Sequence, residues 1–235
     1  MPAVDEVGRA LDALRSGAFV LVYDGDGREA ETDLVVASEF VTPEAVRTLR
    51  KDAGGLLCVT LYGDVRARLG LPFMSEVLRE AAHAFPLLEA VEQEDIRYDR
   101  HSAFSITINH RDTFTGVTDR DRALTISRFA SLTREALRRE NGWAARAFAA
   151  EFRSPGHVPL LNADEPLLEA RRGHTELTTA LTVMAGLVPS ATLCEMMADD
   201  GRALSKEDAK AYARARNLAF LEGHDIVRAW RAWSE

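Results

Sequence analysis

The chain has 235 residues, of which 46% are hydrophobic and 28% are charged, as in an ordinary globular protein. Its net charge of −8 argues against a nucleic-acid backbone as the main ligand, because neutralising phosphates requires a basic face. No apolar run approaches the roughly 18 residues of a membrane span, and the N-terminus lacks the apolar segment of a signal peptide. We therefore expect a cytoplasmic protein without a membrane partner, with Cys58 and Cys194 both reduced.

Helices and strands alternate along the chain, with no linker, internal repeat or low-complexity tract. Apolar residues recur at helical spacing in some segments, and short β-branched runs indicate buried strands in others. This alternation predicts one α/β domain over residues 1–235, with a layered mixed sheet and helices on its faces. In chain order we predict a helix ending at Gly17, strands 18–22 and 34–37, a helix 43–53, strands 56–61 and 104–109, a helix from Thr118 to about Ser131, a turn at 154–157 leading into a short strand, a helix ending near Gly186, a strand 191–197, a turn at 199–201, a helix from Ser205, a strand 218–221 and a terminal helix from Asp225.

Two segments are harder to assign. Within residues 62–101, the stretch 69–74 is expected to be a loop with apolar anchors, and 76–84 fits a short helix or a mobile lid. Residues 132–149 are rich in Arg and Ala and are interpreted as a helical insertion.

The most informative stretch runs from Tyr23 to Asp33 and places five carboxylates and one arginine in a loop between two predicted strands. Carboxylates this close repel one another unless a positive charge lies among them, either a divalent cation or the Arg28 guanidinium. Glu29, Glu31 and Asp33 alternate, so an extended backbone would point them the same way, toward a shared cation or a polyhydroxylated ligand. The alternative is a solvated acidic turn.

A second informative stretch spans residues 171–175, just before a predicted helix. Two arginines offer bidentate donors for phosphate, Gly173 permits close approach of the backbone, and the helix adds its positive end. His174 can bind a metal or transfer protons near neutral pH. The alternative is an Arg-rich surface turn that caps a helix.

Four further residues are of interest, and three of them carry two interpretations. Glu195 lies in an apolar strand and is either functional or a member of a buried ion pair with an arginine. His157 is a proton-transfer candidate or a structural residue, Cys58 is most simply a core residue, and Thr115 either binds a phosphate oxygen or closes a turn. Together with the two stretches, they indicate a divalent-metal enzyme that acts on a small phosphorylated polyol.

These motifs resemble 3,4-dihydroxy-2-butanone 4-phosphate synthase, the enzyme that supplies the four-carbon unit of riboflavin. Thr32 in the acidic loop and the sequence at 71–74 are similar to archaeal members. The matching segments occur in the family's order, at residues 23–35, 54–58, 114–117, 121–123, 155–158, 171–176 and 194–195.

The resemblance implies the fold of that family and conversion of D-ribulose 5-phosphate to L-3,4-dihydroxy-2-butanone 4-phosphate and formate. The reaction would proceed by metal-assisted enolisation, dehydration, skeletal rearrangement and loss of C4. It also implies Mg²⁺ or Mn²⁺, with two ions when substrate is bound, although oxygen ligands suit Mg²⁺ better than imidazole does. The family forms a homodimer with active sites at the interface, to which His157 of the partner subunit would contribute.

The resemblance also assigns roles to individual residues, carried over motif by motif. The metal ligands would be Glu29 and His174. Acid–base or orienting roles would fall to Asp24, Glu31, His157 and Glu195. The substrate would contact Arg28, Asp33, Cys58, Thr115, Arg171 and Thr175.

Two other functions compete with this assignment. One is a different metal-dependent sugar-phosphate lyase or isomerase. The other is a non-catalytic RNA-binding module, because the family's fold resembles that of YrdC-type domains. The net charge argues against RNA binding, and its best support is an arginine cluster comprising Arg134, Arg138, Arg139, Arg146 and Arg153.

Overall fold

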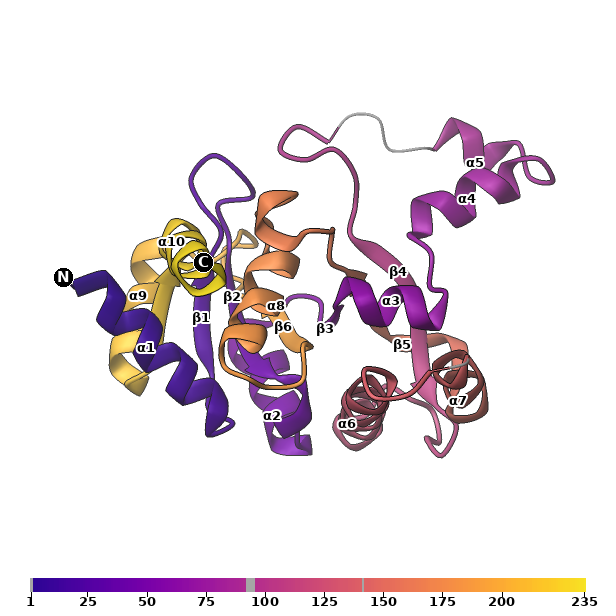
Figure 1. Ribbon diagram of the computed structural model, residues 1–235. Coiled ribbons are helices and arrows are strands. Elements are labelled where there is room, and N and C mark those ends of the chain that lie inside the picture. The colour runs from indigo at the N-terminus through magenta and orange to yellow at the C-terminus, as the bar shows by residue number, and fades with distance from the viewer. Residues whose placement is uncertain (1, 92–95, 141) are drawn as a thin grey trace.

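A computed structural model describes residues 2–91, 96–140 and 142–235 (Figure 1). Its helices are α1 (Pro2–Arg15), α2 (Pro43–Thr48), α3 (Gly63–Leu69), α4 (Met74–Ala82), α5 (Leu87–Ala90), α6 (Asp119–Ala136), α7 (Trp143–Glu151), α8 (His174–Met184), α9 (Lys206–Arg216) and α10 (Gly223–Ser234), with short helical turns η1 (Ser38–Phe40), η2 (Leu49–Ala53) and η3 (Leu167–Glu169). The strands are β1 (Val20–Tyr23), β2 (Thr32–Ala37), β3 (Cys58–Leu61), β4 (Phe104–His110), β5 (Phe152–Asn162), β6 (Ala191–Glu195) and β7 (Ala219–Glu222).

The strands form one mixed sheet in the order β4-β5-β3-β6-β2-β1-β7. The β1–β7 and β3–β5 pairs are parallel, and the other neighbours are antiparallel. Because β6 lies between β2 and β3, the chain brings the ends of three distant segments together at the centre of the sheet. This topology places the acidic loop, the glycine pair 54–55 and Glu195 near one another.

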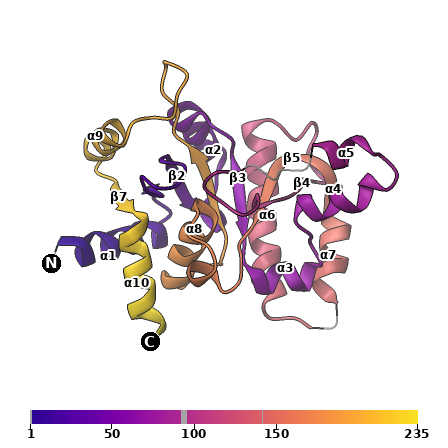
Figure 2. The same cartoon turned by 90° about the horizontal axis from the view of Figure 1, so that it is seen from above.

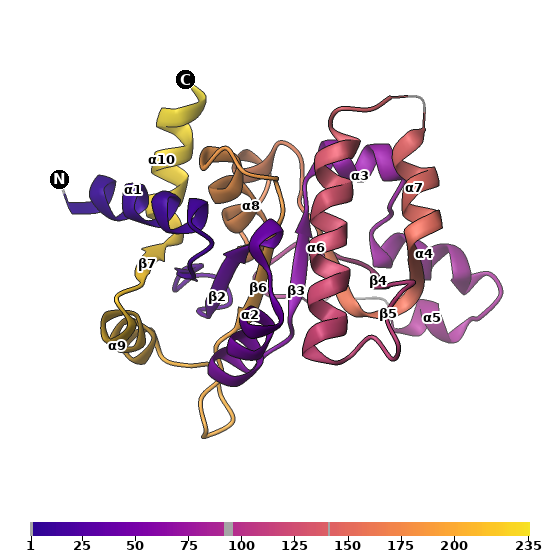
Figure 3. The ribbon, with the colours of Figure 1, turned by 90° about the horizontal axis from the view of Figure 1, so that it is seen from below.

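Helices cover both faces of the sheet, so the predicted fold class is confirmed. Alternate residues of β1 point to opposite faces. Val20 and Val22 belong to a core that includes residues of α1, α8 and α10, whereas Leu21 belongs to a core that includes residues of α2, α3, α6, α7 and α9. Figure 3 shows α1, α8 and α10 grouped together, apart from α6 and α7. Both faces of the central strands are therefore buried, which explains their continuous apolar sequence.

The region 152–162 differs from the prediction of a turn before a short strand. The segment 154–157 lies inside the single long strand β5, whose pairing with β4 shifts register between Ile108 and Asn109. A Cβ on Gly156 would lie 2.0 Å from the carbonyl carbon of Ile108, so glycine allows the two backbones to approach. The register shift and this close approach accommodate residues that otherwise favour a turn.

Residues 62–101 and 132–149 also differ in detail from expectation. The helix predicted to end near Ser131 continues to Ala136, because Leu132 and Ala136 are buried in the core, and α7 follows after a short connection. Whether 132–149 is an insertion stays a prediction. The seven-residue α3 was not predicted, since it is too short for a clear period. Residues 74–82 form a helix, α4, and Figure 2 shows α4 and α5 at the end of the molecule opposite α9 and α10.

Candidate active site

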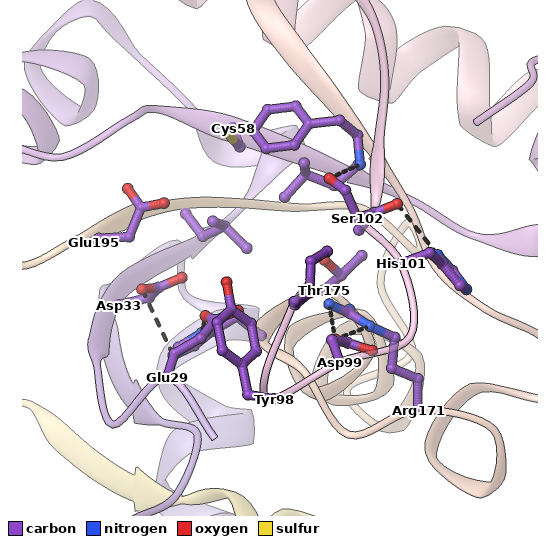
Figure 4. Close-up of a pocket in the computed structure, with 16 residues that line it drawn as sticks. Glu29, Asp33, Cys58, Tyr98, Asp99, His101, Ser102, Arg171, Thr175 and Glu195 are labelled. Carbon is purple, nitrogen blue, oxygen red and sulfur yellow. Dashed lines mark hydrogen bonds and ion pairs between the residues drawn. The ribbon is translucent and has the colours of Figure 1, made fainter. Parts of the chain in front are cut away.

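The candidate site lies where the central strands end. Asp33 of β2 and Glu195 of β6 are directly paired in register, and Cys58 of β3 pairs with Leu193. A cavity of about 200 Å³ opens beside these strand ends and the start of α8. Figure 4 shows Glu29, Asp33 and Glu195 on one side of it and Arg171 and Thr175 on the other. Seven of the predicted site residues line this cavity: Glu29, Asp33, Cys58, Arg171, His174, Thr175 and Glu195.

Asp24 organises the acidic loop rather than lining the cavity. Its carboxylate accepts hydrogen bonds from the backbone N–H groups of Gly25, Glu29 and Glu31 at 2.8, 2.9 and 3.2 Å. The loop is folded rather than extended, because Ala30 has a φ of 56°. The expectation that an extended backbone aligns the alternating carboxylates is therefore wrong; contacts made by Asp24 position this turn instead.

His174, the first residue of α8, lies between two carboxylates of the loop region. Nδ1 of His174 is 3.1 Å from Oε2 of Glu29, and Nε2 is 3.6 Å from Oδ1 of Asp33. Burial lowers the pKa of His174, but Asp33 and Glu29 outweigh burial and raise that pKa to about 10.

Burial is also the largest influence on the Asp33 carboxyl. Burial, with the negative charges of Glu195, Glu29 and Glu31, raises the pKa of Asp33 to about 8 despite the opposing effect of His174. Burial together with Glu29 and Glu195 likewise raises the pKa of Glu31. Without a cation, this cluster therefore retains protons at neutral pH.

The donor set fits a divalent cation. Asp24, Glu29 and His174 offer ligand atoms that lie within 4.8 Å of one another. Nε2 of His174 and Oδ1 of Asp33 are buried, and neither has a hydrogen-bond partner among the described residues. A cation would satisfy such atoms and would oppose the mutual repulsion of the carboxylates. Because both Asp24 oxygens already accept backbone hydrogen bonds, Glu29 and His174 are the better ligands in this group.

On the opposite side of the cavity, the carboxylate of Asp99 contacts two arginines, of which Arg171 lines the cavity. Oδ2 of Asp99 accepts from Nη2 of Arg28 at 2.8 Å and from Nε of Arg171 at 2.7 Å. Nη1 of Arg171 also donates to buried Glu176 at 2.7 Å. Arg171 is therefore held from two sides at the start of α8, close to Thr175.

Glu195 has no arginine partner among the residues that the structure describes, contrary to the ion-pair alternative. Its Oε2 accepts instead from the backbone N–H of Leu56 at 2.7 Å. A Cβ on Gly55 would lie 2.4 Å from that same oxygen, so glycine is required where the two segments meet.

Cys58 is a buried free thiol at the cavity edge, and burial raises its pKa well above the usual value.

Two predicted site residues lie away from this cavity, in an exposed cluster beside β4 and β5. Asn109 joins them: its Oδ1 accepts from the backbone N–H of His157 at 2.8 Å, and its Nδ2 donates to the carbonyl of Thr115 at 3.4 Å. Phe114, next to Thr115, has 94% of its surface exposed. His157 and Thr115 are thus brought together, but not to the cavity of their own chain.

The sequence reasoning missed the residues that border the cavity from the segment before β4. These are Tyr98, Asp99, His101 and Ser102, and Figure 4 shows Tyr98 next to Glu29. No local motif marks them, because they approach the site through the long connection from α5. For residues 76–84, the short-helix alternative is the one observed, because most of this stretch lies in α4, and it does not line the cavity.

The profile of the 3,4-dihydroxy-2-butanone 4-phosphate synthase family matches residues 8–229. The chain belongs to this family. Curated synthases of Methanosarcina mazei and Methanothermobacter thermautotrophicus are 48% and 47% identical to it. The matches cover 98% of this chain in both cases, and 93% and 98% of the relatives.

Solved structures of the synthase family share the fold. A synthase from Candida albicans is 29% identical with a TM-score of 0.71, over 95% of this chain and 96% of that one. A synthase crystallised with two magnesium ions is 27% identical with a TM-score of 0.71, over 94% of each chain. None of the described helices has the length and apolar character that crossing a membrane requires.

Proposed function

We propose that this synthase-family chain converts D-ribulose 5-phosphate to L-3,4-dihydroxy-2-butanone 4-phosphate and formate, a step of riboflavin biosynthesis. The observation that carries the proposal is that Glu29, Asp33 and His174 lie together on one cavity, with Arg171 on its opposite side. Carboxylates and imidazole suit proton transfers on a polyol, and the arginine suits its phosphate. Family membership and the synthase relatives support the same assignment.

We assign the cation site to Glu29 and His174, and Mg²⁺ or Mn²⁺ to that site. A divalent cation there would polarise substrate oxygens and make neighbouring C–H and O–H groups more acidic. The related crystal structure with two magnesium ions supports two ions in the loaded site. The buried Asp33 carboxylate faces the same space and is suited to hold substrate hydroxyls.

Further residues of the cavity and of the acidic loop beside it would bind the substrate and transfer protons. Arg171 and Thr175, with Arg28 of the loop, would hold the phosphate at the start of α8. Glu31 and Glu195 would exchange protons while C3 loses a proton and water leaves from C1. C5 then moves from C4 to C3, so that the C4–C5 bond breaks as the C3–C5 bond forms, and water cleaves the C3–C4 bond to release C4 as formate. Asp24 would keep the loop in place through its backbone hydrogen bonds, and Cys58 would form part of the cavity wall.

The exposed cluster at Thr115 and His157 supports a homodimer. Phe114 and Val117 are exposed beside it, and an aromatic side chain at the surface favours burial by a partner. We propose that a second copy buries this face, so that Thr115 and His157 of each chain complete the active site of the other.

The RNA-binding alternative loses its main support. Among the proposed arginines, Arg134 pairs with Glu39, Arg138 and Arg139 pair with Glu135, and Arg153 donates to Thr113. These guanidinium groups are therefore engaged within the chain, although they remain partly exposed. The cytoplasmic location stays a prediction.

An NMR time course with D-ribulose 5-phosphate and Mg²⁺, beside an EDTA control, tests the proposed reaction. We expect formate and a four-carbon phosphate only when metal is present. A different product would favour another sugar-phosphate lyase or isomerase. Substrate that persists with both Mg²⁺ and Mn²⁺ would contradict the proposal.

A further inference from the structure

A second charged hollow lies on the outer side of the acidic loop, between α10 and the segment that precedes α8. It consists of two adjoining cavities of about 360 and 250 Å³, which share Arg172, Val227 and Arg231. We call this pair of cavities the arginine groove. It lies apart from the cavity of about 200 Å³ described above, with which it has no lining residue in common.

The arginine groove contains positive charge that the chain does not neutralise. Among the described residues, no carboxylate pairs with Arg172 or Arg231, and Arg172 donates only to the carbonyl of Leu168 at 3.4 Å. Both guanidinium groups nevertheless line the same two cavities. In a chain of net charge −8, two unpaired like charges facing one hollow indicate a site for an anion.

Further donors surround the larger cavity. Arg228 and His224 line it from the first turns of α10, where both contact the single carboxylate of Asp225. Arg28 reaches it from the acidic loop, and Asp24 is the acidic residue of its lining. Arg28 is already paired with Asp24 and Asp99, and Arg228 with Asp225, so the positive charge of the groove that the described residues do not neutralise comes from Arg172 and Arg231. Planar guanidinium groups bind phosphate in bidentate geometry.

The smaller cavity has a different character. Leu168, Val227 and Trp230 form its apolar part, and Glu169 accepts from the Trp230 indole at 3.2 Å, which fixes that ring. Trp230 also stacks on Trp233, with ring centroids 5.3 Å apart. An arginine-rich cavity next to an apolar, aromatic one matches a ligand with a phosphate at one end and an organic group at the other.

We propose that the arginine groove binds a small phosphorylated organic molecule, with its phosphate between Arg172 and Arg231 and its organic part against Leu168, Val227 and Trp230. This site is distinct from the proposed active site, although Arg28 borders the groove and also contacts Asp99 of the active site, and its existence does not depend on the proposed reaction. The shared chemistry is a phosphate monoester, which a nucleotide or a sugar phosphate supplies.

Calorimetric titration of the full chain with adenosine 5′-monophosphate, inorganic phosphate and adenosine tests the proposal. We expect the nucleotide to bind more tightly than either fragment, and Arg231→Glu to weaken its binding by at least about tenfold, as loss of a charge-assisted phosphate contact requires. Arg231→Ala should weaken it in the same direction. Arg202→Glu is the matched control, because that arginine side chain is 85% exposed on a distant turn. Ribose 5-phosphate in place of the nucleotide identifies which organic group the apolar part prefers.

A second pair of variants distinguishes binding in the arginine groove from binding in the cavity at the start of α8. Arg171→Ala should leave nucleotide binding unchanged, and Trp230→Phe should abolish the change in tryptophan fluorescence that accompanies binding. Unaltered affinity in Arg231→Glu, or affinity lost in Arg171→Ala, would assign the binding to the site at α8 and overturn the proposal. Equal affinity for inorganic phosphate and both esters would overturn the role of Leu168, Val227 and Trp230.

Discussion

Nη2 of Arg171 lies 2.6 Å from Oδ2 of Asp99, so a carboxylate occupies the place beside the arginine where we expect the substrate's phosphate. The same oxygen accepts a hydrogen bond from Arg28. Burial raises the pKa of Asp99, but the hydrogen bonds from Arg171 and Arg28 outweigh burial and hold that pKa below its usual value. Asp99 is therefore ionised at neutral pH and competes with phosphate for both arginines.

The first prediction follows from this competition. Asp99→Asn should lower the inhibition constant of inorganic phosphate by about five- to tenfold, because it removes a repulsion of about 1 kcal/mol, as for two charges about 4 Å apart in a well-solvated site. Inhibition of formate release at several phosphate concentrations measures it. A higher inhibition constant in Asp99→Asn would show instead that Asp99 holds the arginines in their binding geometry.

The second prediction concerns the proposed metal ligands. Glu29→Gln and His174→Ala should each reduce formate production by at least about a hundredfold, because each removes a ligand and a proton-transfer partner. Circular dichroism should show an intact fold, since Glu29 lies in a loop and His174 at a helix end. The exposed Glu44→Gln and His83→Ala are matched controls. Wild-type rates in either ligand variant would contradict the assignment.

The third prediction separates chemistry from stability at Glu195. Glu195→Gln keeps an acceptor for the Leu56 N–H but removes the charge, so activity should fall by about a hundredfold with little change in melting temperature. Gly55→Ala should lower both the activity and the melting temperature, because the Cβ of the new alanine would lie 2.7 Å from the Glu195 carbonyl oxygen. A Glu195→Gln enzyme that loses stability but retains its rate would make Glu195 a structural residue.

Much of the fold was predictable because its signals are local. The run 34–37 is buried on both faces, and the helices predicted from residues 43, 118 and 205 do begin there. Thr42, Thr118 and Ser205 cap them by accepting hydrogen bonds from backbone N–H groups of their first turns. The turn predicted at 154–157 is wrong, because pairing with β4 holds that segment in a strand. This is a tertiary effect that no local sequence pattern contains.

The distinction between local sequence signals and tertiary effects also applies to the candidate active site. Glu29, Asp33, His174 and Glu195 were predicted from their motifs and meet because β6 pairs with β2. Asp99 was not predicted, because it acts only through Arg28 and Arg171, which are 71 and 72 residues away in sequence. Long connections that cover a cavity carry no periodic signal.

The last prediction concerns the pH dependence of metal binding. The pKa of His174 is raised to about 10, so the imidazole is protonated at pH 7 and must lose that proton before it can ligate a cation. Metal affinity should therefore rise with pH, by about tenfold per unit between pH 6 and 8, with release of at least one proton for each bound cation.

Calorimetric titration with Mn²⁺ in buffers of different ionisation enthalpy measures both the affinity and the protons released. In His174→Ala the affinity should be lower and its dependence on pH weaker, because the imidazole proton is gone and Asp33, whose pKa burial raises, then supplies the main exchangeable proton. His83→Ala should match the wild type. An affinity that is constant from pH 6 to 8 would mean that the imidazole is already neutral, and that Glu29 and Asp33 do not hold a proton on His174.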